Sequence, residues 1–226
     1  MNVLLFSDLH ESSRGLWALS DFLSKNKDIS GLVFAGDLVN MGEPVSFAEK
    51  FVEEISKFKL PLLWVPGNND FGESYKVLQN FTPSLEGRIV ELGNRSFTGI
   101  GGSPASWASE YAGENSLSSD QIAGTILVTH QPPDGVRYAP SYKKQDTSDK
   151  QIPNLEYPNS NGAMKQLNNE VRLADAPIAH ICGHVHNTQG IGYIGETKVI
   201  KLASSALGNI AIMNLDNLEV NFLRLL

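Results

Sequence analysis

The N-terminal third of the sequence alternates short apolar runs with longer amphipathic stretches, and this alternation limits the possible folds strongly. Residues 3–6, 32–35 and 62–65 are the apolar runs. Between them, apolar side chains recur at helical spacing: Leu16, Leu19, Phe22, Leu23, Phe47, Phe51, Val52 and Ile55. A strand–helix–strand–helix–strand order of this length predicts parallel strands joined by right-handed crossovers, typical of α/β proteins.

The rest of the chain favours strands. The candidate segments are residues 89–92, 97–100, 125–129, 178–182, 189–194, 198–202, 210–215 and 218–225. Asn94 and the pair Asp216 and Asn217 have the residue types of hairpin turns. We therefore expect a mixed sheet first and a more antiparallel sheet later. No fixed-period repeat or clear linker divides the chain, which predicts a single domain over residues 1–226.

Composition excludes several classes of protein. The chain has 226 residues, of which 41% are hydrophobic and 19% charged, as in ordinary folded domains. A net charge of −7 argues against a non-specific nucleic-acid coat or a binder of anionic membranes. The single cysteine, Cys182, allows no intramolecular disulfide. No apolar stretch approaches about 20 residues, and the N-terminus lacks the pattern of a signal peptide. A cytoplasmic protein is the expectation.

Residues 131–160 differ from the rest because they show little periodicity and contain five prolines and three of the six tyrosines. Loops of this length in compact domains are usually functional lids or disordered segments. The loop follows His130, which favours a lid that recognises substrate. Its tyrosines, including Tyr138, are candidate stacking partners for a base or an aromatic leaving group.

Polar side chains of the kind that bind metals follow five predicted strands. These residues are Asp8, His10, Asp37, Asn68, His130, His184 and His186. Because open α/β sheets bind ligands beyond the carboxyl ends of their strands, we expect these side chains to converge. Two pairs of these residues are spaced two positions apart: Asp8 with His10, and His184 with His186. In an extended segment, the side chains of such a pair face the same way. Four of the five histidines in the chain belong to this set.

The ligand types indicate which metals the site would bind. Imidazole, carboxylate and amide oxygen without thiolate suit Mn²⁺, with Fe²⁺, Ni²⁺ and Zn²⁺ as alternatives. Seven ligands are too many for one ion, which predicts two. Two cations about 3.5–4 Å apart can clamp a phosphoryl group and activate water.

The ordered series Asp8-x-His10, Gly36-Asp37, Gly67-Asn68, His130 and Gly183-His184-x-His186 resembles the calcineurin-like metallophosphoesterase superfamily over residues 1–205. The resemblance implies a four-layer αββα sandwich, with two mixed β-sheets flanked by helices. It implies that Asp8, His10 and His186 hold one metal, that Asn68, His130 and His184 hold the other, and that Asp37 bridges them. It also implies in-line attack on phosphorus by a hydroxide shared between the ions.

Two positions depart from the family pattern. Asn69 stands where many members carry a histidine that protonates the leaving group or grips phosphate. It is the candidate catalytic residue, with helix capping as the alternative. Asn40 stands where a carboxylate is frequent, which puts the orientation of a ligand histidine in doubt.

The resemblance and the absence of an arginine from residues 36–42 favour a metal-dependent phosphodiesterase that acts on a small phosphoester or phosphodiester. A non-catalytic scaffold and a nuclease are the alternatives. No obligate protein partner, nucleic acid or membrane is expected.

Other polar residues have simpler interpretations. Arg14 is a candidate phosphate contact, although a solvated arginine at the start of a helix is the more common case. Asp70 is interpreted as the cap of a helix that begins near Phe71. His180 is interpreted as a hydrogen-bonded strand residue, and Cys182 as an inert buried thiol.

Overall fold

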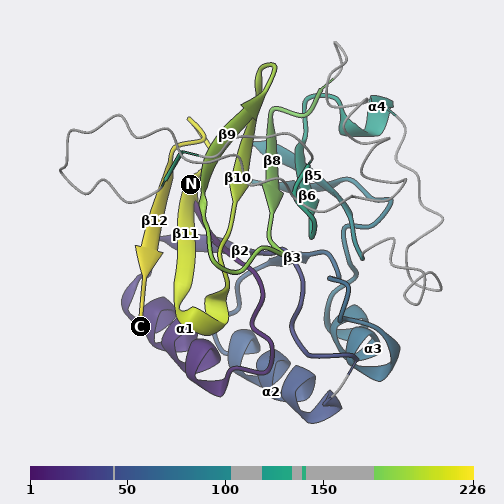
Figure 1. The fold of residues 1–226 in the computed structure, drawn as a ribbon, viewed down its shortest axis with the longest axis vertical. Coiled ribbons are helices and arrows are strands. Elements are labelled where there is room, and N and C mark those ends of the chain that lie inside the picture. Colours follow the sequence, from purple (N-terminus) through teal and green to yellow (C-terminus); the bar gives the residue numbers. More distant parts are fainter. Residues whose placement is uncertain (43, 103–118, 134–138, 141–175) are drawn as a thin grey trace.

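The computed structural model describes residues 1–42, 44–102, 119–133, 139–140 and 176–226. Within these residues the chain forms two mixed β-sheets that pack against each other, with helices outside them, which is an α/β sandwich (Figure 1). The predicted fold class is therefore confirmed. The prediction of a single domain over residues 1–226 stays a prediction.

The first sheet has the strand order β12-β11-β1-β2-β3. Its strands are β1 (Asn2–Phe6), β2 (Ile29–Phe34), β3 (Leu62–Trp64), β11 (Asn209–Asn214) and β12 (Val220–Arg224). Strands β1, β2 and β3 are parallel, as the alternating pattern predicts. Strand β11 pairs antiparallel with both β1 and β12, so the C-terminal hairpin returns to the first sheet.

The second sheet has the order β4-β5-β6-β8-β10-β9-β7. Its strands are β4 (Val90–Leu92), β5 (Arg95–Ile100), β6 (Ile126–Thr129), β7 (Ala139–Pro140), β8 (Ala179–Cys182), β9 (Gly190–Ile194) and β10 (Thr197–Lys201). The predicted antiparallel character is wrong for its centre, because β5, β6, β8 and β10 are parallel. Long connections, not hairpins, separate β5 from β6 and β6 from β8.

Helices α1 (Ser13–Lys25), α2 (Val45–Ser56) and α3 (Gly72–Phe81) lie together on the first sheet (Figure 1). Alternation along β1 divides its side chains between two cores. Leu4 and Phe6 pack with the helices, whereas Val3 and Leu5 pack between the sheets. The helix α4 (Ser119–Ile122) contacts the second sheet, where Ile122 packs with Leu127.

The loop predicted over residues 131–160 lies mostly outside the described residues. Its described part includes β7, which pairs with β9. In the described part of the chain, no helix has the length and apolar character needed to cross a membrane.

Candidate metal centre

Backbone hydrogen bonds join the loops that follow β1 and β2. The Asp8 N–H donates to the Gly36 carbonyl (2.8 Å), and the His10 N–H donates to the Asp37 carbonyl (3.2 Å). These bonds hold the two aspartates beside each other at the carboxyl ends of neighbouring parallel strands. Asp8, His10 and Asp37 all have positive φ (56°, 44° and 60°), which L-residues rarely adopt. Such strain concentrates at functional sites.

Two glycines allow the remaining loops to approach the aspartates closely. A Cβ on Gly183 would lie 1.9 Å from Ser7 Oγ and 2.8 Å from Asp8 Oδ2. A Cβ on Gly67 would lie 2.1 Å from Asp37 Oδ1. Neither contact is sterically possible, so the residues that precede His184 and Asn68 must lack a side chain.

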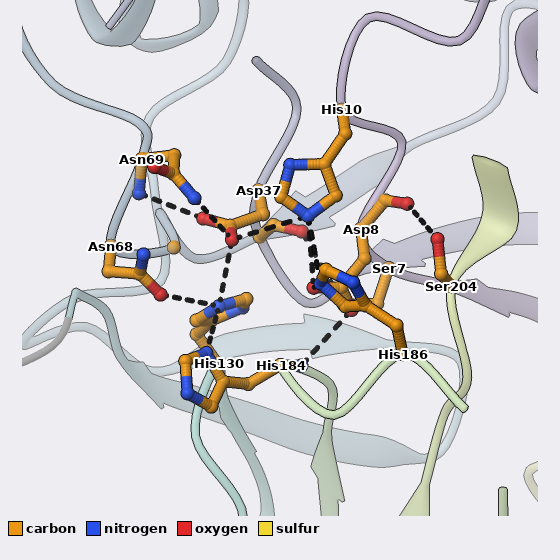
Figure 2. Close-up of polar contacts among 12 residues, drawn as sticks. Ser7, Asp8, His10, Asp37, Asn68, Asn69, His130, His184, His186 and Ser204 are labelled. Atoms are coloured by element: carbon orange, nitrogen blue, oxygen red, sulfur yellow. Dashed lines mark hydrogen bonds and ion pairs between the residues drawn. The ribbon is translucent and has the colours of Figure 1, made fainter. Parts of the chain in front are cut away.

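The first cluster of candidate ligands contains Asp8, His10, Asp37 and His186, each of which offers one ligand atom within 4.8 Å of the others. The Nε2 atoms of His10 and His186 are 3.0 Å apart. His186 Nε2 lies 3.3 Å from Asp8 Oδ1, and His10 Nε2 lies 3.6 Å from Asp37 Oδ2. Figure 2 shows both imidazoles directed toward the two carboxylates.

The second cluster contains Asp37, His130 and His184, whose ligand atoms also lie within 4.8 Å of one another. His130 Nε2 is 3.3 Å from Asp37 Oδ2, 3.1 Å from His184 Nδ1 and 3.1 Å from Asn68 Oδ1 (Figure 2). Asp37 belongs to both clusters. The structure thus brings together all seven residues that the sequence predicts as ligands, and Asp37 lies where the two clusters meet.

The carboxylate of Asp8 supplies an independent test of whether a cation fits. Its Oδ2 accepts hydrogen bonds from Ser7 Oγ (2.6 Å) and the His184 N–H (3.0 Å). Its Oδ1 is buried and has no hydrogen-bond partner among the described residues. Burial raises the pKa of Asp8, but contacts with His10 and His186 outweigh this effect and hold the pKa well below its usual range. A buried anionic oxygen that makes no hydrogen bond and faces two imidazole nitrogens, His186 Nε2 at 3.3 Å and His10 Nε2 at 3.7 Å, fits a metal ligand.

Two histidines have their ring orientation fixed by hydrogen bonds from Nδ1. The Nδ1–H of His10 donates to Asn40 Oδ1 (2.9 Å), and the Nδ1–H of His130 donates to the Ala35 carbonyl (2.7 Å). Each bond leaves Nε2 directed at the centre, the arrangement that hydrogen-bond acceptors impose on metal-binding histidines. The side-chain oxygen of Asn40 therefore accepts the hydrogen bond that a carboxylate at this position would accept. His10 is oriented by this bond although Asn40 departs from the family pattern.

The electrostatics of the second cluster favour positive charge. Burial lowers the pKa of His130, yet the Asp37 carboxylate outweighs burial and raises the pKa to about 10. Burial lowers the pKa of His184 to about 4, and repulsion from His130 adds to this effect. The buried carboxylates of Asp37 and Asp8 both raise the pKa of His130, so they favour positive charge at this position. The carboxylate, imidazole and amide donors, without thiolate, fit a pair of divalent ions.

Sequence reasoning missed two serines that support Asp8 and assigned the wrong role to Asp70. Ser7 Oγ donates to the side chain of Asp8, and Ser204 Oγ donates to the Asp8 carbonyl (2.7 Å; Figure 2). The capping role predicted for Asp70 is wrong, because the N-cap residue of α3 is Phe71 and has no side-chain cap bond. The Asp70 carboxylate instead accepts backbone N–H bonds from residues 37–39 and from Gly67. For Ser7, the sequence signal that could have indicated this role is its position directly before Asp8.

The remaining candidates differ in their relation to the centre. Asn69 directs its amide at Asp37 and does not cap α3. Arg14 lies in the first turn of α1 with an exposed side chain. Tyr138 lies outside the described residues. The prediction for His180 is confirmed, because it is buried and its Nε2 bonds to Thr129 Oγ1 (2.7 Å). Cys182 is buried as predicted, and its inertness stays a prediction.

Comparison with known proteins finds one similar sequence and solved structures of the same fold. The chain is 28% identical over 209 residues to the uncharacterized protein MJ1162 of Methanocaldococcus jannaschii, and the match covers 88% of this chain and 87% of that protein. It shares its fold with TT1561 of Thermus thermophilus (TM-score 0.72, 14% identity, 100% of this chain and 99% of the other). A dimetal phosphatase from Danio rerio also has this fold (TM-score 0.64, 12% identity, 100% and 96%).

Family membership follows from the sequence itself. The model of the calcineurin-like phosphoesterases matches residues 1–201 of the 226-residue chain, a range that contains all seven candidate ligands. The chain belongs to the calcineurin-like phosphoesterase family.

Proposed function

We propose that this protein is a phosphodiesterase that requires two divalent cations. The observation that carries the proposal is the pair of ligand clusters that share Asp37. In this assignment Asp8, His10 and His186 hold one ion, and Asn68, His130 and His184 hold the other. Family membership and the fold of the Danio rerio dimetal phosphatase support phosphoester hydrolysis.

Two cations bound in these clusters would neutralise the charge of a phosphoryl group and activate water for attack on phosphorus. The side chains prepare the site for this chemistry. Ser7 and the His184 N–H orient the Asp8 carboxylate, while Asn40 and the Ala35 carbonyl keep the Nε2 atoms of two histidines directed inward. We propose Mn²⁺ as the metal, because its ligand preferences include imidazole, carboxylate and amide oxygen.

The preference for diesters rests on the residues around the centre. Asn69 occupies the position of the histidine that many relatives use on the leaving group, and an amide cannot donate a proton at neutral pH. Residues 36–42 also contain no arginine. A small diester with a good leaving group fits this site, and the net charge of −7 gives no general attraction for nucleic acid.

The test is hydrolysis of bis(p-nitrophenyl) phosphate by the Mn²⁺-loaded protein, with p-nitrophenyl phosphate as the monoester. We expect faster hydrolysis of the diester, and loss of activity in Asp37→Asn. Asp28→Asn changes an exposed carboxylate and is the matched control. Equal activity of the wild type and Asp37→Asn would contradict the proposal, and a preference for the monoester would contradict its diester specificity.

A further inference from the structure

Asn69 contacts both oxygen atoms of the carboxylate that the two clusters share. Its backbone N–H donates to Asp37 Oδ1 (2.9 Å), and its side-chain Nδ2 donates to Asp37 Oδ2 (2.8 Å). Figure 2 shows both bonds as dashed lines from Asn69 to the carboxylate of Asp37. Asp37 Oδ2 also faces His130 Nε2 at 3.3 Å and His10 Nε2 at 3.6 Å. Asn69 Nδ2 therefore contacts the same carboxylate oxygen that faces both clusters.

The orientation of the Asn69 amide is fixed at both ends. Its Oδ1 accepts from the Met41 N–H (3.3 Å), and its carbonyl accepts from the Gly42 N–H (2.7 Å). A carboxylate only accepts hydrogen bonds, so the NH₂ group must face Asp37 and the oxygen must face Met41. Met41 has a positive φ of 51°, and its bond to Asn69 stabilises this uncommon conformation.

We propose that Asn69 is a positioning residue that holds the shared carboxylate of Asp37, and that it does not act on the leaving group. This inference rests on the function proposed above. The amide has both of its functional ends bonded within the protein, to Asp37 and to the loop after β2. Its contribution to hydrolysis is then to set the direction of the Asp37 oxygen atoms, and its loss weakens the binding of both ions.

The first test measures metal affinity without turnover. Metal-free wild type and Asn69→Ala are titrated with Mn²⁺, and free Mn²⁺ is read by electron paramagnetic resonance. Loss of a partner of a metal ligand typically costs about 10–100-fold in affinity, which is the expected weakening. Asn94→Ala is the matched control, because Asn94 bonds to exposed Asp216 and not to the centre.

The second test uses a series of aryl phosphodiesters whose phenols differ in acidity. A positioning residue affects every ester alike, so kcat/KM of Asn69→Ala should fall by the same factor across the series. A residue that assists the leaving group would give a factor that grows as the phenol becomes a poorer leaving group. Thermal denaturation checks that each variant is folded. Asn69→Ser, which lacks the amide, is the second variant and should behave in the same way.

The outcomes separate this inference from the proposed function. Mn²⁺ affinity equal to that of the wild type in both variants, or a rate loss that grows with phenol pKa, overturns the positioning role. A wild type that binds no Mn²⁺ overturns the proposed function and the inference together. Weaker Mn²⁺ binding with a uniform rate loss supports the inference.

Discussion

The backbone N–H of Asp37 donates a 2.7 Å hydrogen bond to the carboxylate of Asp70. The same carboxylate accepts from the N–H groups of Leu38 (2.8 Å), Val39 (3.3 Å) and Gly67 (2.9 Å). One buried side chain thus satisfies four backbone donors in the loops after β2 and β3. Because those loops carry Asp37 and Asn68, Asp70 holds candidate ligands of the second cluster in register.

Asp70→Asn should destabilise the fold. An asparagine has one acceptor oxygen, so its NH₂ group must face backbone donors. A buried donor left unsatisfied costs about 1–3 kcal/mol, and we expect the free energy of unfolding to fall by about this amount. Denaturant unfolding measures the change. The control Asp28→Asn, at an exposed position, should change stability by less than about 0.5 kcal/mol. Identical unfolding midpoints for the two variants would refute this role.

Asn40→Ala should weaken metal binding. It removes the acceptor of the His10 Nδ1–H, so the ring is free to rotate and Nε2 is no longer held toward the first cluster. We expect a loss of about 10–100-fold in Mn²⁺ affinity, measured by isothermal titration calorimetry. Asn40→Asp keeps an acceptor and should bind Mn²⁺ at least as tightly as the wild type. If Asn40→Ala binds Mn²⁺ as tightly as the wild type, the hydrogen bond from His10 to Asn40 does not orient the His10 ring for metal binding.

His180 should make the metal-free protein sensitive to acid. Burial lowers the pKa of His180 from 6.5 to about 3, so the folded state keeps the ring neutral where the unfolded state takes up a proton. This residue's contribution to stability is complete above pH 6.5 and declines between pH 6.5 and about 3. The slope is at most about 1.4 kcal/mol per pH unit.

The variant His180→Gln, which does not titrate in this range, isolates that contribution. Urea unfolding of both proteins in EDTA, from about pH 7 to about pH 4, gives the two slopes. We expect a shallower pH dependence in the variant, because the other titrating groups are common to both proteins. If the free energy of unfolding changes equally with pH in both proteins, His180 is not the source of the acid sensitivity.

Metal removal should lower stability. Without cations, the buried carboxylates of Asp8 and Asp37 repel each other, and Asp8 Oδ1 makes no hydrogen bond among the described residues. Binding to the folded state alone stabilises it by about 2.7 kcal/mol for each site at about 100 times its Kd. The melting temperature should therefore rise with Mn²⁺ and fall with EDTA. An unchanged melting temperature at high Mn²⁺ would contradict binding at this site.

The sequence predicts the parallel β1–β2–β3 unit and the ligand set because both depend on local patterns. Short apolar runs and helical spacing are visible over a few residues, and polar residues at strand ends identify the edge where ligands gather. The turns at Asn94 and Asp216 are confirmed as the hairpins β4–β5 and β11–β12 for the same reason.

Features that depend on contacts between residues far apart in the chain cannot be predicted from local sequence patterns. The parallel order of β5, β6, β8 and β10 depends on how long connections pack, which no local pattern records. Asp70 has the residue type and position of a helix cap. Its carboxylate nevertheless accepts hydrogen bonds from the N–H groups of residues 37–39, which lie 31 to 33 residues earlier in the chain. A carboxylate can satisfy near or distant donors equally well, and only the tertiary structure decides between them.

The central claim is that seven side chains from five strand ends form one centre for two cations. Titration of the metal-free protein with Mn²⁺ in a calorimeter tests it most directly, because the stoichiometry counts the ions. The expected result is about two ions per chain for the wild type, and fewer for Asp37→Asn, which alters the shared ligand. A wild type that binds no Mn²⁺, or that binds as Asp37→Asn does, would contradict the claim.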